Sequence, residues 1–143
     1  TDRGGQITWH GPGQLMIYTL LDVRRLDLGA RALANLLEKT IITVLNNFGM
    51  ATYAKRDAPG VYVQHEGAEA KIAALGLRVK KNGCYHGAAL NIDCDLAPFS
   101  GINPCGYAGQ AVTRLADCVK QLPSRAEIEQ CVIEQFVQVL RYD

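Results

Sequence analysis

One cysteine of this sequence has the surroundings expected of a reactive thiol. Cys105 lies between Asn103-Pro104 and Gly106-Tyr107, and this composition predicts a loop. Reactive groups concentrate on loops that a rigid scaffold holds in place. A thiol in such a position can act as the nucleophile of an acyl transfer and carry the acyl group as a thioester.

The remaining cysteines favour structural roles, because a buried free cysteine behaves as a small hydrophobe. They are Cys84, Cys94, Cys118 and Cys131. The total of five is odd and no C-x-x-C pair occurs, which disfavours a zinc site and a disulfide framework. We therefore expect free thiols in a reducing compartment.

A nucleophilic cysteine needs a nearby cation or base, because its ordinary pKa of about 8.5 leaves little thiolate at neutral pH. The candidates are Lys71, His10 and His86. A cysteine–histidine pair is the general arrangement. Lys71 begins an otherwise apolar run, and the residues alone favour a lysine at a strand end with its ammonium in solvent. The residues thus indicate a cysteine acyl-transfer site, and they do not determine which group activates the cysteine.

A glycine-rich segment lies near the start of the chain. Arg3-Gly4-Gly5-Gln6 is followed by His10-Gly11-Pro12-Gly13-Gln14, where backbone can approach other groups closely. The segment lacks the Lys-Ser/Thr ending and the strand-to-helix context of a phosphate-binding loop. A turn that opens a hairpin is the favoured interpretation.

Composition limits the class of protein. A chain of 143 residues with 48% hydrophobic and 20% charged residues has the make-up of one folded domain. The net charge of +1 gives no bulk attraction to nucleic acid or to an anionic membrane. The longest apolar runs, such as Leu15–Leu21, fall short of the roughly 20 residues of a membrane helix. We expect a soluble protein.

Two apolar patterns predict amphipathic helices. Apolar residues from Leu33 to Phe48 recur with helical spacing, and Gly49 follows as a C-terminal cap. Ser124 and Glu127 form a capping box ahead of a second apolar stripe, Ile128–Leu140. The chain is therefore expected to close with a helix.

The rest of the chain predicts short strands separated by polar or glycine-containing turns. The apolar runs are Gln14–Leu21, Gly60–Val63, Lys71–Val79 and Ala88–Asp93. The segment Ala97–Gly109 is expected to form an ordered loop. Strands in short-linked succession, without regular alternation with helices, indicate an α+β fold with a mixed or largely antiparallel sheet.

Several segments carry a family resemblance. They are RGGQITWHGPGQ (3–14), DAPGVYV (57–63), KIAALGLRV (71–79), HGAALN (86–91) and INPCG (102–106). In this order they resemble the successive motifs of the lipoyl(octanoyl) transferases, and the match runs to about Gly109.

The resemblance implies a fold shared with lipoate and biotin protein ligases: a mixed, largely antiparallel sheet with helices packed on one side and the acyl site along the open face. It implies transfer of an octanoyl group from octanoyl-acyl carrier protein to a lysine of a lipoyl domain. The implied acceptors are lipoyl domains of 2-oxoacid dehydrogenase acyltransferase subunits and the glycine cleavage H protein. It implies no cofactor, no metal, and neither nucleic acid nor membrane as a partner.

By the same resemblance, Cys105 corresponds to the acyl-thioester nucleophile and Lys71 to the lysine that pairs with it. The positions that correspond to the substrate pocket are Arg3, Gly4, Gly5, Gln6, Ile7, Thr8, Trp9, His10, Ala74, Leu75, Gly76, Gly87, Ala88 and Ala89. His86 is expected to line the site as well. The small residues among these would leave an apolar slot for the acyl chain.

Two other functions stay open. An ATP-dependent lipoate or biotin ligase would share the fold but needs no cysteine nucleophile, so Pro104-Cys105-Gly106 counts against it. A non-catalytic module that binds lipoyl domains or carrier proteins would not need both Lys71 and Cys105. Family members carry a segment ahead of the Arg-Gly-Gly motif, so residues 1–143 are expected to be the larger part of a single acyltransferase domain. A bacterial cytoplasm is the expected compartment, with a mitochondrial matrix as the alternative.

Overall fold

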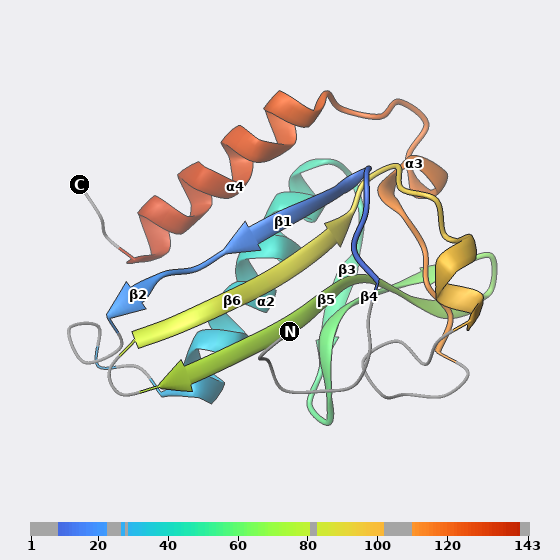
Figure 1. The fold of residues 1–143 in the computed structure, drawn as a ribbon. Coiled ribbons are helices and arrows are strands. Elements are labelled where there is room, and N and C mark those ends of the chain that lie inside the picture. The colour runs from blue at the N-terminus through green and yellow to red at the C-terminus, as the bar shows by residue number, and fades with distance from the viewer. Residues whose placement is uncertain (1–8, 23–26, 28, 81–82, 102–109, 141–143) are drawn as a thin grey trace.

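The structure is a computed structural model of the chain. It describes residues 9–22, 27, 29–80, 83–101 and 110–140, without the side chains of residues 77–80, 83–86 and 101. Figure 1 draws the remaining segments as a grey trace.

The strands form one six-stranded sheet (Figure 1). They are β1 (Gln14–Tyr18), β2 (Leu21–Asp22), β3 (Thr52–Lys55), β4 (Ala58–His65), β5 (Ala68–Lys80) and β6 (Gly83–Asn91). Their order across the sheet is β1-β6-β5-β4-β3, and β2 also pairs with β6. The described strands pair antiparallel, and a parallel bridge joins Lys71 to Val112. The predicted α+β fold with a largely antiparallel sheet is confirmed.

Two long helices build a layer against the sheet. α2 (Ala30–Asn47) lies behind the sheet in Figure 1, while α4 (Arg125–Leu140) runs beside β1 and packs against α2. The core between these elements includes Leu37, Ile41, Val44 and Leu45 of α2, Val61, Leu75 and Leu90 of the strands, and Ile128 and Val132 of α4. We call the face of the sheet that points away from α2 the open face.

The helix ends follow the sequence signals. Gly49 has a φ of +88°, and the Met50 N–H donates to the Leu45 carbonyl at 3.0 Å, which closes α2. The Ser124 hydroxyl accepts the N–H of Glu127 at 3.1 Å and so caps α4. No helix in the described part of the chain is long and apolar enough to cross a membrane.

The structure adds elements that the sequence did not predict. The predicted strand Gln14–Leu21 divides into β1 and β2. Unpredicted are β3, the 3-10 helix η1 (Ala97–Gly101) and α3 (Leu115–Cys118). β3 is a half-buried strand at the sheet edge and α3 is a single turn, so neither leaves a periodic apolar pattern. The rest of the predicted loop, 102–109, lies outside the described residues.

Candidate active site

Small side chains line the middle of the open face. Ala73 and Leu75 of β5 pair with Leu90 and Ala88 of β6, and these residues belong to the core on the α2 side. Successive strand residues point to opposite faces, so the residues between them face away from α2. These are Ala74 and Gly76 of β5, and Gly87 and Ala89 of β6. They form a strip of small residues on this face of the sheet.

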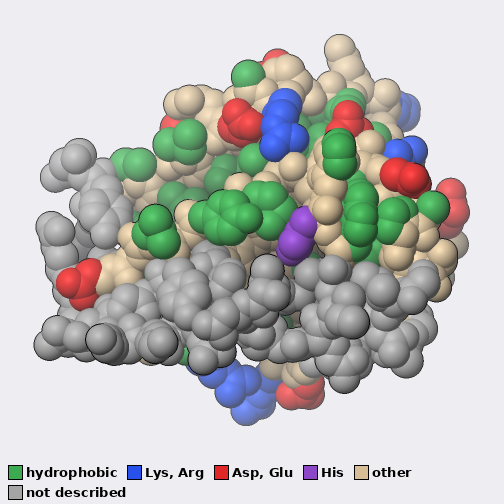
Figure 2. All heavy atoms as spheres, viewed as in Figure 1, with side chains coloured by type: hydrophobic (Ala, Val, Ile, Leu, Met, Phe, Trp, Pro, Cys, Tyr) green, Lys and Arg blue, Asp and Glu red, His purple; other side chains and the backbone are tan. Residues whose placement is uncertain are grey.

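β1 borders this strip. Leu15 and Ile17 face the core, so Gln14, Met16 and Tyr18 face the open side. A Cβ at Gly87 would collide with the Ile17 carbonyl oxygen, so the two strands approach closely where the side chain is missing. Figure 2 shows hydrophobic side chains in a band across the face seen in Figure 1.

A bulge turns Lys71 onto the open face. Val61 of β4 pairs with Ala73, whereas the next residue, Tyr62, pairs with Lys71, so Ile72 is an extra residue in β5. Ile72 and Ala73 both lie in the core. Because the extra residue shifts the alternation of side chains, Lys71 points to the face opposite Ala73.

Lys71 is buried in this position. Its side chain is 2% exposed, and its ammonium lies 5.5 Å from the centre of the Tyr62 ring. The ammonium of Lys55 lies 4.9 Å from the same ring. The expectation that Lys71 ends a strand with its ammonium in solvent is therefore wrong. The sequence could not show this, because the bulge arises from pairing with another strand.

Gly60 makes room for the Lys71 side chain. Its φ is +143°, and a Cβ there would lie 3.0 Å from Cε of Lys71 and 2.9 Å from the Ala73 carbonyl oxygen. The Gly60 N–H donates to Oε1 of Glu38 on α2 at 3.1 Å. Burial raises the pKa of this carboxyl, and the hydrogen bond from Gly60 opposes that shift.

The backbone of Lys71 is bonded to the segment that follows η1 in the described chain. Its N–H donates to the Ala111 carbonyl at 2.8 Å, and its carbonyl accepts the Thr113 N–H at 2.9 Å. Cys105 precedes Ala111 by a few residues and lies outside the described residues. Lys71 is thus fixed to the chain just beyond the predicted nucleophile.

The end of the glycine-rich segment forms a tight turn into β1. Gly13 has a φ of +89°, its carbonyl accepts the Ile92 N–H at 3.0 Å, and a Cβ there would lie 2.5 Å from Cα of Cys94. Trp9 packs edge-on against Phe99 with ring centres 5.6 Å apart. For the described part of this segment, the predicted turn is confirmed. The hairpin is wrong, because β1 pairs with β6, which is distant in sequence, and not with the strand that follows it.

Buried polar side chains connect this turn with the segment beside Lys71. Nε2 of Gln14 donates to Oδ1 of Asn91 at 2.9 Å, and Nδ2 of Asn91 donates to the Thr113 carbonyl at 3.1 Å. Oε1 of Gln14 lies 3.2 Å from Nδ1 of His10. His10, Lys71 and the open face therefore belong to one connected region.

Two other cysteines are poor nucleophiles. Burial raises the pKa of the Cys94 thiol and that of the Cys118 thiol. Cys118 Sγ lies 3.8 Å from Nδ1 of His65, but the raised pKa keeps the thiol neutral. Among the described residues, no three His, Cys, Asp or Glu side chains gather as a metal site.

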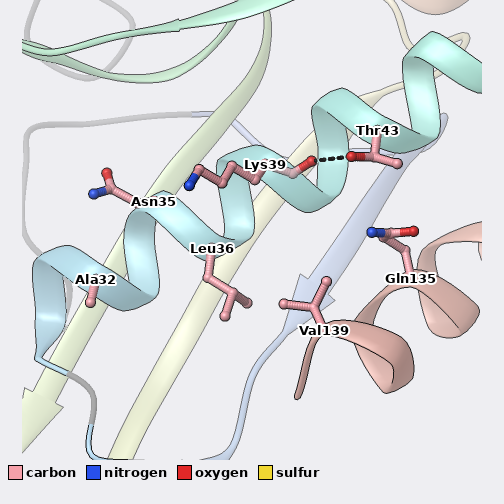
Figure 3. Close-up of a pocket in the computed structure, with 7 residues that line it drawn as sticks. All are labelled: Ala32, Asn35, Leu36, Lys39, Thr43, Gln135 and Val139. Atoms are coloured by element: carbon pink, nitrogen blue, oxygen red, sulfur yellow. Dashed lines mark hydrogen bonds between the residues drawn. The ribbon is translucent and has the colours of Figure 1, made fainter. Parts of the chain in front are cut away.

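A pocket of about 510 Å³ lies between α2 and α4 (Figure 3). Its lining residues are Ala32, Asn35, Leu36, Lys39, Thr43, Gln135 and Val139. It belongs to the helical layer and includes none of the predicted site residues. The open face therefore remains the candidate acyl site.

The structure brings together part of the predicted site. Lys71, Ala74, Gly76, Gly87 and Ala89 share the open face, and the turn that contains Trp9 and His10 is bonded to its border. Leu75 and Ala88 turn their side chains into the core, so only their backbone can contribute. Arg3, Gly4, Gly5, Gln6, Ile7, Thr8 and Cys105 lie outside the described residues, as does the side chain of His86.

Sequence reasoning did not single out Tyr62, Gly60, Glu38 and Asn91. Three of them lie within the segments that carry the resemblance, whereas Glu38 is a helix residue. A carboxylate within an apolar helix stripe was the signal that could have drawn attention to Glu38.

Comparison with known proteins agrees with this architecture. Residues 1–137 match the family described as the lipoyl protein ligase A/B catalytic domain. The chain therefore belongs to the lipoyl protein ligase A/B catalytic domain family.

Relatives with similar sequences carry the name octanoyltransferase. The protein from Cellvibrio japonicus (strain Ueda107) is 50% identical over 143 residues, which is 100% of this chain and 65% of that protein. The protein from Pseudomonas entomophila (strain L48) is 59% identical over 117 residues, which is 82% of this chain and 53% of that protein. The chain thus spans between about half and two thirds of the length of these relatives.

Solved structures share the fold at low sequence identity. The bi-partite lipoate protein ligase from Thermoplasma acidophilum superposes with a TM-score of 0.74 at 18% identity, over 99% of this chain and 57% of that chain. Biotin protein ligase from Aquifex aeolicus gives a TM-score of 0.69 at 18% identity, over 90% of this chain and 53% of that chain. The predicted lipoate and biotin ligase-like fold is confirmed.

Proposed function

We propose that the protein transfers an octanoyl group from octanoyl-acyl carrier protein, through a thioester on Cys105, to a lysine of a lipoyl domain. The observation that carries this proposal is the burial of Lys71 on the open face, where its backbone is bonded to the segment just beyond Cys105. The octanoyltransferases that are 50% and 59% identical support the type of reaction.

The first step forms the enzyme thioester. The Lys71 ammonium favours the thiolate of Cys105, because a nearby cation lowers the pKa of a thiol. The thiolate attacks the carbonyl carbon of the carrier thioester, and the bond from that carbon to the carrier sulfur breaks. The departing sulfur takes a proton from the Lys71 ammonium, so the carrier leaves as a thiol.

The second step forms the amide. The ε-amine of the acceptor lysine attacks the carbonyl carbon of octanoyl-Cys105, and the bond from that carbon to the Cys105 sulfur breaks. The neutral Lys71 amine takes one proton from the attacking nitrogen. Lys71 is thereby returned to its ammonium form and Cys105 to its thiolate.

The small-residue strip is the surface along which the octanoyl chain would lie. Beyond the bulge at Ile72, Gly76 stands about 7 Å from Ala74 along β5, at the usual strand rise. Gly87 and Ala89 of β6 lie beside them. An acyl chain along these residues would bury its methylene groups against the sheet, which contributes about 0.8 kcal/mol per buried CH₂.

The partners follow from this chemistry. The donor is octanoyl-acyl carrier protein, and the acceptors are lipoyl domains of 2-oxoacid dehydrogenase acyltransferase subunits and the glycine cleavage H protein. The bacterial relatives and the free thiols favour action in a bacterial cytoplasm.

A transfer assay without ATP tests the proposed function. The full-length protein is mixed with octanoyl-acyl carrier protein and an unmodified lipoyl domain, and the mass of the lipoyl domain is followed. The proposal predicts octanoylation without ATP, and its loss in Lys71→Met and Cys105→Ala. Transfer that requires ATP would identify a ligase, and binding without transfer would identify a non-catalytic module.

A further inference from the structure

The hydrogen bonds around Gln14 fix the orientation of its amide. Its Nε2 donates to Oδ1 of Asn91 at 2.9 Å and to the Trp9 carbonyl at 3.4 Å. Its Oε1 accepts the Gly11 N–H at 3.3 Å and faces Nδ1 of His10 at 3.2 Å. An amide has two N–H donors and two acceptor positions, and these contacts use all of them.

Backbone groups leave no freedom to reverse this orientation. The Trp9 carbonyl can only accept and the Gly11 N–H can only donate, so Gln14 must turn its nitrogen to the first and its oxygen to the second. Asn91 is fixed in the same way, because the Thr113 carbonyl accepts from its Nδ2. Gln14, Asn91 and Thr113 are at most 5% exposed, so water does not compete for the bonds from Gln14 to Asn91 and from Asn91 to Thr113.

The orientation of Gln14 determines where His10 carries its hydrogen. The Gln14 oxygen has no hydrogen to give, so Nδ1 of His10 must be the donor. In the neutral ring, the lone pair then lies on Nε2. His10 is exposed beside the open face, so this nitrogen is accessible to a substrate.

We propose that His10, held in the Nδ1–H tautomer by Gln14 and Asn91, accepts a hydrogen bond at Nε2 from the ε-amine of the acceptor lysine. This inference rests on the proposed function. His10 contacts the substrate amine, whereas Gln14 and Asn91 are positioning residues that act through His10.

The amide-forming step is the one that needs an acceptor. Thioester formation begins with a thiolate, which has no hydrogen to donate to Nε2 of His10, whereas an attacking amine gains positive charge on its N–H groups as it bonds to carbon. The attacking amine has two N–H bonds: Lys71 takes one proton, and Nε2 of His10 accepts a hydrogen bond from the other. No proton moves to His10, while the nitrogen–carbon bond forms and the bond from carbon to the Cys105 sulfur breaks.

Nitrogen-15 NMR of the full-length protein tests the tautomer without any substrate. At a pH where the rings are neutral, we expect the His10 signals to show the hydrogen on Nδ1, with the assignment made from their loss in His10→Gln. Gln14→Met removes the acceptor for Nδ1 and should lose this preference. A hydrogen on Nε2 in the wild-type protein would overturn the inference.

Single-turnover kinetics test the role of Nε2. In His10→Phe, we expect transfer from octanoyl-Cys105 to the lipoyl domain to slow about threefold to tenfold more than thioester formation, the effect of one neutral hydrogen bond. His10→Gln retains an acceptor oxygen and should recover part of the loss. Equal slowing of both steps would contradict the role of His10 Nε2 in amide formation. Absence of any thioester in the wild-type protein would instead refute the proposed function, whereas the His10 tautomer is tested by NMR without substrate.

Discussion

Gly60→Ala is the substitution that tests most sharply how the fold places Lys71. The new Cβ would lie 3.0 Å from Cε of Lys71 and 2.9 Å from the Ala73 carbonyl oxygen. Ordinary contacts between carbon atoms begin near about 3.5 Å. The Ala73 carbonyl belongs to a strand in the middle of the sheet and cannot shift cheaply, so its contact with the new Cβ destabilises the variant. The flexible lysine moves away by about half an ångström.

The backbone contributes a second effect. A φ of +143° is rarely adopted by residues with a side chain, and such strain costs about 1–3 kcal/mol. A loss of about 2 kcal/mol lowers the Tm of a domain of this size by about 4–8 °C. Displacement of the Lys71 ammonium is expected to reduce acyl transfer about tenfold, because misplacement by 1 Å can reduce a rate about a hundredfold.

Gly67→Ala is the matched control. Gly67 also has a positive φ, +79°, but nothing lies within 4 Å of the position of its Cβ. This variant should lose about 1 kcal/mol of stability from backbone strain and keep the wild-type transfer rate. Both variants are compared by thermal unfolding and by octanoyl transfer at a temperature below either Tm. Equal transfer rates in the two variants would refute the argument that Gly60 makes room for Lys71.

The remaining predictions concern pH, the lysine and a helix cap. Burial raises the pKa of Glu38, so the fold favours its protonated form, and the free energy of unfolding should fall as the pH rises above about 4.3 through the raised pKa. Glu38→Gln should remove this fall while keeping the acceptor for Gly60. If the unfolding free energies of the wild-type protein and of Glu38→Gln, measured in urea, change with pH in the same way, this prediction is contradicted. Lys71→Met should fold, because a buried charge is replaced by an apolar chain of similar length, but should lose about 10²- to 10⁴-fold in transfer rate, measured as lipoyl-domain octanoylation; wild-type transfer would exclude Lys71 as the proton carrier. Ser124→Ala should lower the unfolding free energy by about 1 kcal/mol with unchanged transfer, since it removes only the cap of α4; an unchanged Tm would show that the cap contributes nothing.

Local signals in the sequence predict much of the fold. The apolar stripe that ends at Gly49 and the capping box of Ser124 and Glu127 correspond to the ends of α2 and α4, because helix ends depend on nearby residues. The turn at Glu66 and Gly67 between β4 and β5 likewise lies where the sequence predicts a polar or glycine-containing turn. Short elements such as α3 are not predicted, because a single helical turn is too short to show a periodic pattern of apolar residues.

The position of Lys71 depends on contacts that are distant in sequence. The bulge at Ile72 is set by pairing with β4, and the room for the lysine side chain is set by Gly60. The contact between Gln14 and Asn91 joins residues 77 positions apart. The sequence can indicate which residues form the site, but it does not show to which face of the sheet strand pairing directs their side chains.

The most direct test of the central claim is the intact mass of the full-length protein after incubation with octanoyl-acyl carrier protein, without ATP. We predict one octanoyl adduct that hydroxylamine removes, as expected of a thioester, and that a lipoyl domain discharges. The adduct should be absent from Cys105→Ala. An adduct that persists in Cys105→Ala, or that forms only when ATP is added, would contradict the account.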